Sequence, residues 1–135
     1  MRIVLDTNVW LSAIFWEGEA SKIIEGLVNK KTKIIISKEI ISEIIDVLNK
    51  ETKFQRFLNN RRQDIEELIR TILSISELIE TKTKLKIIKH DSDNRILETA
   101  VDGKADYIIS YNKHLLDLKE FKNIKILLPS DPLEL

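Results

Sequence analysis

Three carboxylates stand at separate positions where an apolar run gives way to an expected helix. Asp6 directly ends the first such run, Glu43 lies in the helix expected after the second, and Asp93 opens the helix expected after the third. Carboxylate oxygens select hard divalent cations such as Mg²⁺ or Mn²⁺, which keep several waters and bind phosphate. Converging carboxylates repel one another strongly unless a cation lies between them. The pattern therefore predicts a site for a divalent metal ion, with one or two ions left open.

Each acid also has a simpler structural interpretation. Asp6 and Asp93 are well placed to cap the helices that follow them, which is a common role for aspartate. Glu43 lies at the border of an apolar helix stripe and could simply flank it. The occurrence of all three acids at matching junctions favours a shared site. Asp91, two residues before Asp93, is a possible substitute carboxylate.

The elements that must position these acids alternate between strand and helix. Short β-branched runs predict strands at 3–5, 34–36, 85–88, 107–110 and 124–128. Helical spacing and capping residues predict helices at 8–15, 19–29, 38–48, 53–60, 64–79, 94–101 and 112–118. This alternation predicts an α/β fold of three layers, with a central parallel sheet of about five strands and right-handed crossovers. In such a sheet the carboxyl ends of the strands share one edge, where ligands bind.

Composition sets the broad class. The 135 residues, 43% of them hydrophobic and 33% charged, indicate one globular domain over 1–135. The absence of cysteine excludes disulfides and thiolate metal sites and favours a cytoplasmic setting. No apolar stretch reaches membrane-spanning length, so no membrane association is expected.

The formal net charge is zero, so no overall attraction to nucleic acid is expected. Two local windows are basic. The candidates for RNA binding in the first window are Lys50, Lys53, Arg56, Arg61 and Arg62. The second window, from Lys82 to Lys89, holds four lysines and no acid. Either window also fits an ordinary solvated face.

Four motifs in order resemble those of the PIN-domain family, and they cover nearly the whole chain. They are the run 3–9 that contains Asp6-Thr7-Asn8-Val9, the stretch Ser37-Lys-Glu-Ile-Ile-Ser-Glu43-Ile, the helix start Asp93-Asn94-Arg-Ile-Leu-Glu98-Thr-Ala100, and Ala105-Asp-Tyr-Ile-Ile-Ser110. The likeness is to small stand-alone prokaryotic PIN proteins that resemble the toxins of toxin–antitoxin pairs. It implies a PIN-like, Rossmannoid fold.

This resemblance implies a metal-dependent endoribonuclease that uses Mg²⁺ or Mn²⁺ to hydrolyse RNA, and it implies a homodimer with an antitoxin partner across the acidic groove. Asp6, Glu43 and Asp93 match the family's first three acids: Asp6 and Asp93 would bind the metal directly, and Glu43 through water or as a general base. Asn8 and Ser110 match the small polar residues that orient the first acid or a metal-bound water. Cleavage would leave a 5′ phosphate.

The chain departs from the family pattern at Asn112, where relatives usually carry a fourth acid. An amide can accept from a metal-bound water, but it brings no charge. Asn112 therefore keeps a second hypothesis open, a PIN fold that no longer cleaves and serves as an RNA-binding or protein-interaction module. His90 and His114 are interpreted as incidental surface histidines.

Overall fold

The computed structural model describes residues 1–15, 19–28, 32–60 and 64–133. In these ranges six strands form one sheet in the order β3-β2-β1-β4-β6-β5. The strands are β1 (Arg2–Leu5), β2 (Lys33–Ser37), β3 (Glu77–Ile79), β4 (Tyr107–Ile109), β5 (Glu120–Phe121) and β6 (Ile124–Leu127). Every pairing is parallel except that of β5 with β6. The prediction of a parallel α/β sheet is confirmed.

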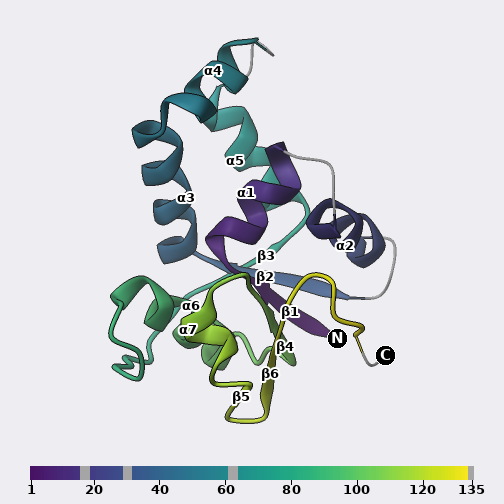
Figure 1. Cartoon of the computed structure of the whole chain (residues 1–135), viewed down its shortest axis with the longest axis vertical. Coiled ribbons are helices and arrows are strands. Elements are labelled where there is room, and N and C mark those ends of the chain that lie inside the picture. The colour runs from purple at the N-terminus through teal and green to yellow at the C-terminus, as the bar shows by residue number, and fades with distance from the viewer. Residues whose placement is uncertain (16–18, 29–31, 61–63, 134–135) are drawn as a thin grey trace.

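Seven helices occur in the described ranges and cover both faces of the sheet (Figure 1). They are α1 (Thr7–Phe15), α2 (Glu19–Val28), α3 (Lys38–Lys50), α4 (Thr52–Asn60), α5 (Ile65–Ser74), α6 (Asp91–Asp102) and α7 (Lys113–Leu116). In Figure 1, α1, α3, α4 and α5 lie above the sheet, whereas α6 and α7 lie below it. None of the described helices combines the length and apolar character that a membrane span requires.

The core is built from the apolar runs that predicted the strands. Ile3 and Val4 of β1 and Ile35 and Ile36 of β2 are fully buried, as expected of central strands covered on both faces. The backbone amide of Asp6 continues the ladder by donating to the carbonyl of Ile109 at 3.1 Å. The first acid is therefore fixed to the carboxyl ends of two neighbouring strands.

Two predicted elements are wrong in the region between residues 64 and 90. The helix expected over 64–79 ends at Ser74, and residues 77–79 form β3 instead. Hydroxyl groups cause this early end: Ser74 and Ser76 donate to the carbonyls of Thr71 and Ile72, both at 2.6 Å. Side-chain bonds of this kind compete with continued helix.

The strand expected over 85–88 is absent, since this stretch is irregular and lies in the connection from β3 to α6. The sixth strand, which the sequence did not predict, is the short β5. It pairs with β6 through a turn whose two residues, Lys122 and Asn123, have φ of 48° and 67°. Positive φ at both positions is what a type I′ hairpin turn requires.

Gly103, at the C-terminal cap of α6, provides a test of how closely this helix packs on the sheet. A Cβ at residue 103 would lie 2.6 Å from Cγ2 of Ile35 and 2.8 Å from the carbonyl oxygen of Thr99. Gly103→Ala should lower the free energy of unfolding by about 1–3 kcal/mol, because the core must shift. Gly26→Ala in α2 is the control: nothing lies within 4 Å of its added Cβ. It should stabilise by about 0.5–1 kcal/mol. Denaturant unfolding of both variants measures the difference, and equal values would contradict this packing.

Candidate metal-binding and catalytic site

Asp6 lies at the junction of β1 and α1, where its two carboxylate oxygens have different partners. Oδ1 accepts the amide of Val9 at 3.0 Å, and Oδ2 accepts the hydroxyl of Ser110 in a short hydrogen bond. Asp6 is therefore a helix cap, as its simpler interpretation predicted, and is also joined to the end of β4. Asp6 as a whole is only 5% exposed. Burial raises its pKa to about 6, opposed by these hydrogen bonds and assisted by the charges of Glu43 and Asp93.

The polar residues after β4 link the first acid to the third. The backbone amide of Asn112 donates to Oγ of Ser110 at 2.8 Å, and Ser110 donates to Asp6. The amide Nδ2 of Asn112 donates to Oδ1 of Asp93 at 2.7 Å. The side-chain oxygen Oδ1 of Asn112 caps α7 by accepting the backbone amide of His114 at 2.8 Å. This bond fixes the orientation of the Asn112 side-chain amide. Asn112 thus supplies a donor to Asp93 at the position where the family resemblance predicted a fourth acid.

Glu43 reaches the site from the second turn of α3. Ser37, the last residue of β2, caps this helix by accepting the amide of Ile40 at 3.4 Å. The hydroxyl of Ser37 also contacts Oγ1 of Thr99 at 2.7 Å, which ties the start of α3 to α6. Burial raises the pKa of Glu43, and the charge of Asp93 adds to this effect. Asp93 is therefore close enough to Glu43 to disfavour ionisation of Glu43.

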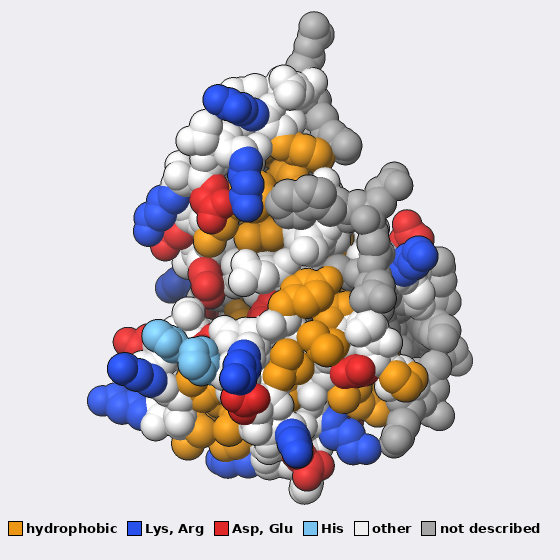
Figure 2. All heavy atoms as spheres, viewed as in Figure 1, with side chains coloured by type: hydrophobic (Ala, Val, Ile, Leu, Met, Phe, Trp, Pro, Cys, Tyr) orange, Lys and Arg blue, Asp and Glu red, His pale blue; other side chains and the backbone are white. Residues whose placement is uncertain are grey.

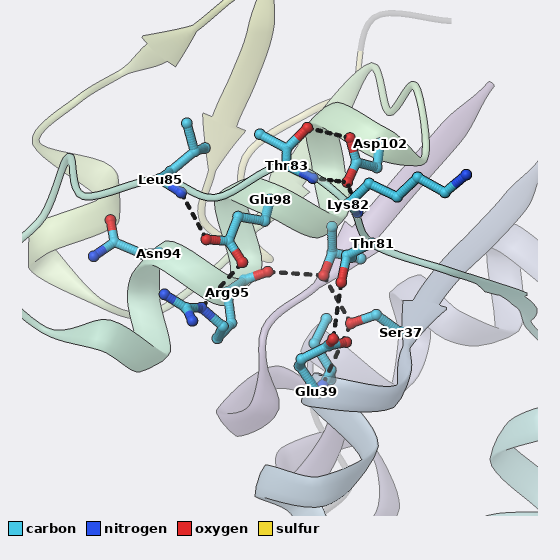
Figure 3. Close-up of polar contacts among 12 residues, drawn as sticks. Ser37, Glu39, Thr81, Lys82, Thr83, Leu85, Asn94, Arg95, Glu98 and Asp102 are labelled. Carbon is cyan, nitrogen blue, oxygen red and sulfur yellow. Dashed lines mark hydrogen bonds and ion pairs between the residues drawn. The ribbon is translucent and has the colours of Figure 1, made fainter.

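The helix that carries Asp93 is held by an irregular connection rather than by the predicted strand. Three side chains of α6, spaced four residues apart, accept backbone amides of this connection. Figure 3 shows those of Glu98 and Asp102. Asp102 accepts those of Lys82 and Thr83 at 2.6 and 2.8 Å, and Glu98 accepts that of Leu85 at 2.8 Å. Asn94 accepts the amides of residues 87 and 88 at 3.0 and 2.9 Å. Side chains of a helix here take the place of a neighbouring strand, which hydrophobic patterning does not reveal.

Asp93 lies in the first turn of α6 but is not its cap. The N-cap residue is His90, which makes no capping hydrogen bond through its side chain. The interpretation of Asp93 as a mere cap is therefore wrong. Its Oδ2 is buried and has no hydrogen-bond partner in the described part of the chain. Burial raises the pKa of Asp93, and the positive charges that His114 and His90 can carry oppose that rise.

The predicted acids share one cleft of about 140 Å³. Its walls are formed by Asp6, Thr7, Asn8, Glu43, Ser92, Asp93, Ile96 and Asn112. The hollow lies between α3 and the pair α6 and α7, with acidic side chains along it (Figure 2). Asn8 lines the cleft as predicted, although the described hydrogen bonds to Asp6 come from Val9 and Ser110. Asp91 is exposed and is not among the lining residues.

The residues at this cleft fit a divalent cation in their chemistry. All three acids have raised pKa values. A cation would offset both the cost of burying their negative charges and the repulsion between those charges. The partnerless Oδ2 of Asp93 is the kind of buried acceptor that an ion or its water satisfies. Among the described residues, no group of three acidic or histidine side chains is close enough to hold an ion without other ligands. An ion would therefore be held partly through water, as Mg²⁺ usually is.

The two histidines of the protein meet at the rim of this cleft. The rings of His90 and His114 have centroids 5.0 Å apart and an interplanar angle of 46°. They lie side by side in Figure 2, below the hollow. Both are exposed, as expected of surface residues, and the positive charge that either can carry favours ionisation of Asp93. The sequence held a signal for this position: His90 lies three residues before Asp93, and His114 lies two residues after Asn112.

The first basic window lies on the far part of α3 and on α4. Lys50 and Arg56 are exposed on these helices, and Lys53 pairs with Glu51 at 3.3 Å. Arg61 and Arg62 lie outside the described residues. In Figure 1, α4 is at the opposite end of α3 from the helices α6 and α7. These basic residues therefore flank the cleft at a distance instead of lining it.

A parallel α/β sheet with an acidic cleft at the carboxyl ends of β1 and β4 defines the class of protein. A family model described as "PIN domain" matches residues 2–114. The chain belongs to the PIN-domain family, whose members are generally nucleases.

The individual proteins that this chain resembles include one relative in sequence and one solved structure. Uncharacterized protein MJ1680 of Methanocaldococcus jannaschii is 30% identical over 129 residues, which cover 93% of this chain and 81% of that protein. The crystal structure of VapBC2 from Rickettsia felis bound to a DNA fragment from their promoter contains a chain that matches with a TM-score of 0.66. The match covers 93% of this chain and 97% of that one at 20% identity, so it establishes likeness of fold.

Proposed function

We propose that this protein is a metal-dependent endoribonuclease that hydrolyses phosphodiester bonds in RNA with Mg²⁺ or Mn²⁺. The observation that carries the proposal is the convergence of Asp6, Glu43 and Asp93 on one cleft, each with a raised pKa. Membership of the PIN-domain family supports a nuclease. A bound divalent ion would contact a phosphate oxygen and lower the pKa of a water that attacks phosphorus.

The residues of the chain have distinct roles in this proposal. Asp6 and Asp93 would hold the ion, and Glu43 would act through a water or take its proton. Ser110 fixes the carboxylate of Asp6, and Asn112 fixes that of Asp93, through the hydrogen bonds already described. Asn8 would orient water at the mouth of the cleft, where it is exposed.

The biological role that we propose is that of a toxin paired with an antitoxin. The structural likeness to the VapBC2 complex supports this assignment. A segment of the antitoxin would lie across the acidic cleft, and the toxin would form a homodimer. Co-expression with the product of a neighbouring small reading frame tests the pairing, because a cognate partner would co-purify and suppress cleavage.

The nuclease proposal is tested with a labelled single-stranded RNA of mixed sequence. Cleavage should appear with Mn²⁺ or Mg²⁺, disappear with excess chelator and return when the metal is restored. Products should carry 5′ phosphates. Cleavage that is insensitive to chelator would contradict the mechanism.

Asn112 favours a second candidate, an RNA-binding or protein-interaction module that does not cleave. The residue is a neutral amide where the family resemblance predicted a fourth acid, and it donates to Asp93, so the cleft carries less negative charge for holding metal. RNA binding without cleavage at any metal concentration would support this second function.

A further inference from the structure

The connection from β3 to α6 displays an alternating pattern of exposure that the nuclease proposal does not use. From Thr81 to Lys86 the side chains alternate between half-buried and exposed, and the exposed ones are Lys82, Lys84 and Lys86. Side chains two apart in an extended chain point to the same side, about 6.6 Å from one another. The three lysines therefore form a row on the outer side of residues 81–86. That spacing is comparable to the distance between neighbouring phosphates of an extended nucleic-acid strand.

The row is fixed in place by α6. The amides of Thr83 and Leu85 donate to Asp102 and Glu98, which hold the extended backbone against the helix. Thr81 adds a hydrogen bond from its hydroxyl to Glu39 of α3 at 2.8 Å. The Lys82 side chain extends away from these contacts (Figure 3). A positioned row loses less conformational freedom on binding than the same lysines in a loose loop.

The row is positively charged and leads toward the cleft, although the charge of Lys82 is partly balanced by Asp102. No ion pair in the described part of the chain involves Lys82, Lys84, Lys86 or Lys89. Beyond the row the chain bends, and Lys89, three residues after Lys86, leads to His90, whose ring lies 5.0 Å from that of His114 in a tilted arrangement. Basic side chains lie directly beside the paired histidines in Figure 2. Since the chain as a whole is neutral, this is a local attraction for a polyanion.

We infer that Lys82, Lys84, Lys86 and Lys89 bind successive phosphates of a single-stranded RNA and lead it past His90 and His114 into the acidic cleft. The inference rests on the proposed nuclease function and names the path of its substrate. An acidic cleft repels RNA, so affinity must come from cations beside it. Every nucleotide of a strand carries a phosphate, so any RNA strand can match this row, whereas a protein would match it only if acidic side chains recurred at every second position of an extended segment.

The test measures binding separately from cleavage. A fluorescein-labelled 12-nucleotide RNA of mixed sequence is titrated with the Asp6→Asn protein in Mg²⁺, and binding is followed by anisotropy. The variant Lys82→Gln/Lys84→Gln/Lys86→Gln should bind at least tenfold more weakly. Its slope of log affinity against log salt should fall by about 2, since each phosphate contact on a single strand contributes about 0.7.

The matched control is Lys22→Gln/Lys33→Gln/Lys104→Gln, which removes the same charge at exposed sites in α2, at the start of β2 and before β4. It should change affinity less than twofold. Equal weakening by both triple variants would overturn the inference, because net charge alone would explain it. Lys84→Gln/Lys86→Gln/Lys89→Gln leaves Lys82, beside Asp102, untouched, and it repeats the test if the first variant is poorly folded by circular dichroism.

Two further outcomes separate this inference from the function on which it rests. Loss of RNA affinity in the row variant, with no cleavage by the wild type, would support the path and overturn the nuclease. If the row variant still cleaves RNA with metal and its KM is unchanged, the proposed nuclease function is supported and the proposed RNA path along the lysine row is overturned. If polyglutamate binds to the lysine row and the RNA affinity does not change when the lysines are replaced, the row serves a protein partner and the inference is overturned.

Discussion

Replacing Asp6 by asparagine is expected to reduce metal-dependent RNA cleavage by more than about a hundredfold, because a direct metal ligand should matter more than the outer residues that support it. The same change should stabilise the metal-free protein above about pH 6, where the buried carboxylate is ionised. Asparagine retains the oxygen that accepts the amide of Val9. Loss of activity combined with a gain in stability would identify a residue kept for function at a cost to the fold.

The sign of the stability effect follows from the pKa. Asp6 titrates at about 6 in the folded protein against 3.8 ordinarily, so the folded state holds its proton more tightly. The metal-free wild type therefore loses stability as the pH rises from about 4 through 6, by at most about 3 kcal/mol. Asp6→Asn should remove that part of the pH dependence. Metal binding and cleavage by the wild type should fall as the pH drops through about 6, since protons compete with the ion.

Asp64→Asn is the matched control for this experiment. Asp64 caps α5 by accepting the amide of Glu67 at 2.8 Å, as Asp6 caps α1, but it is exposed and is not part of the cleft. Asparagine and aspartate are similar as helix caps, so stability should change by less than about 0.5 kcal/mol. Cleavage should be unchanged. Equal loss of activity in both variants would indicate that capping, and not metal binding, explains the effect at Asp6.

Asn112→Asp is expected to raise the affinity for Mn²⁺ by about tenfold or more, in the range that residues next to metal ligands usually control. The change replaces the donor that contacts Oδ1 of Asp93 at 2.7 Å with a fourth carboxylate. Two carboxylates at this distance cannot both ionise readily without a cation. The metal-free variant should consequently be less stable than the wild type at neutral pH, and added Mn²⁺ should restore its stability. Calorimetric titration and thermal unfolding with and without metal measure both effects.

Asn123→Asp makes the same chemical change in the exposed turn between β5 and β6 and should leave metal affinity unaltered. An unchanged affinity in Asn112→Asp would place the metal away from Asp93. Absence of cleavage both before and after this substitution would favour the interaction module over the nuclease. A gain in rate would show that Asn112 weakens a working site.

Local sequence determined the parallel sheet and the position of the first acid. Three fully buried apolar residues before Asp6 require a strand covered on both faces, and a polar residue can follow only where that strand emerges. The carboxyl ends of β1 and β4 then bring Asp6 and Ser110 together, although they are far apart in sequence. Strand periodicity and the rules for connecting parallel strands are therefore sufficient to predict, from sequence spacing, that these residues share one cleft.

Only the tertiary structure decided how Asp93 is held and what surrounds it. The connection before α6 has the apolar alternation of a strand, but its amides bond to Asn94, Glu98 and Asp102 instead of a neighbouring backbone. Such partners are set by the packing of a helix and leave no periodic signal. The same packing brings His90 against His114 and aligns the lysine row. Sequence determined that acids would meet at one edge of the sheet, because backbone ladders follow from local patterns. Tertiary structure decided their partners, because side-chain contacts depend on where distant elements come to lie.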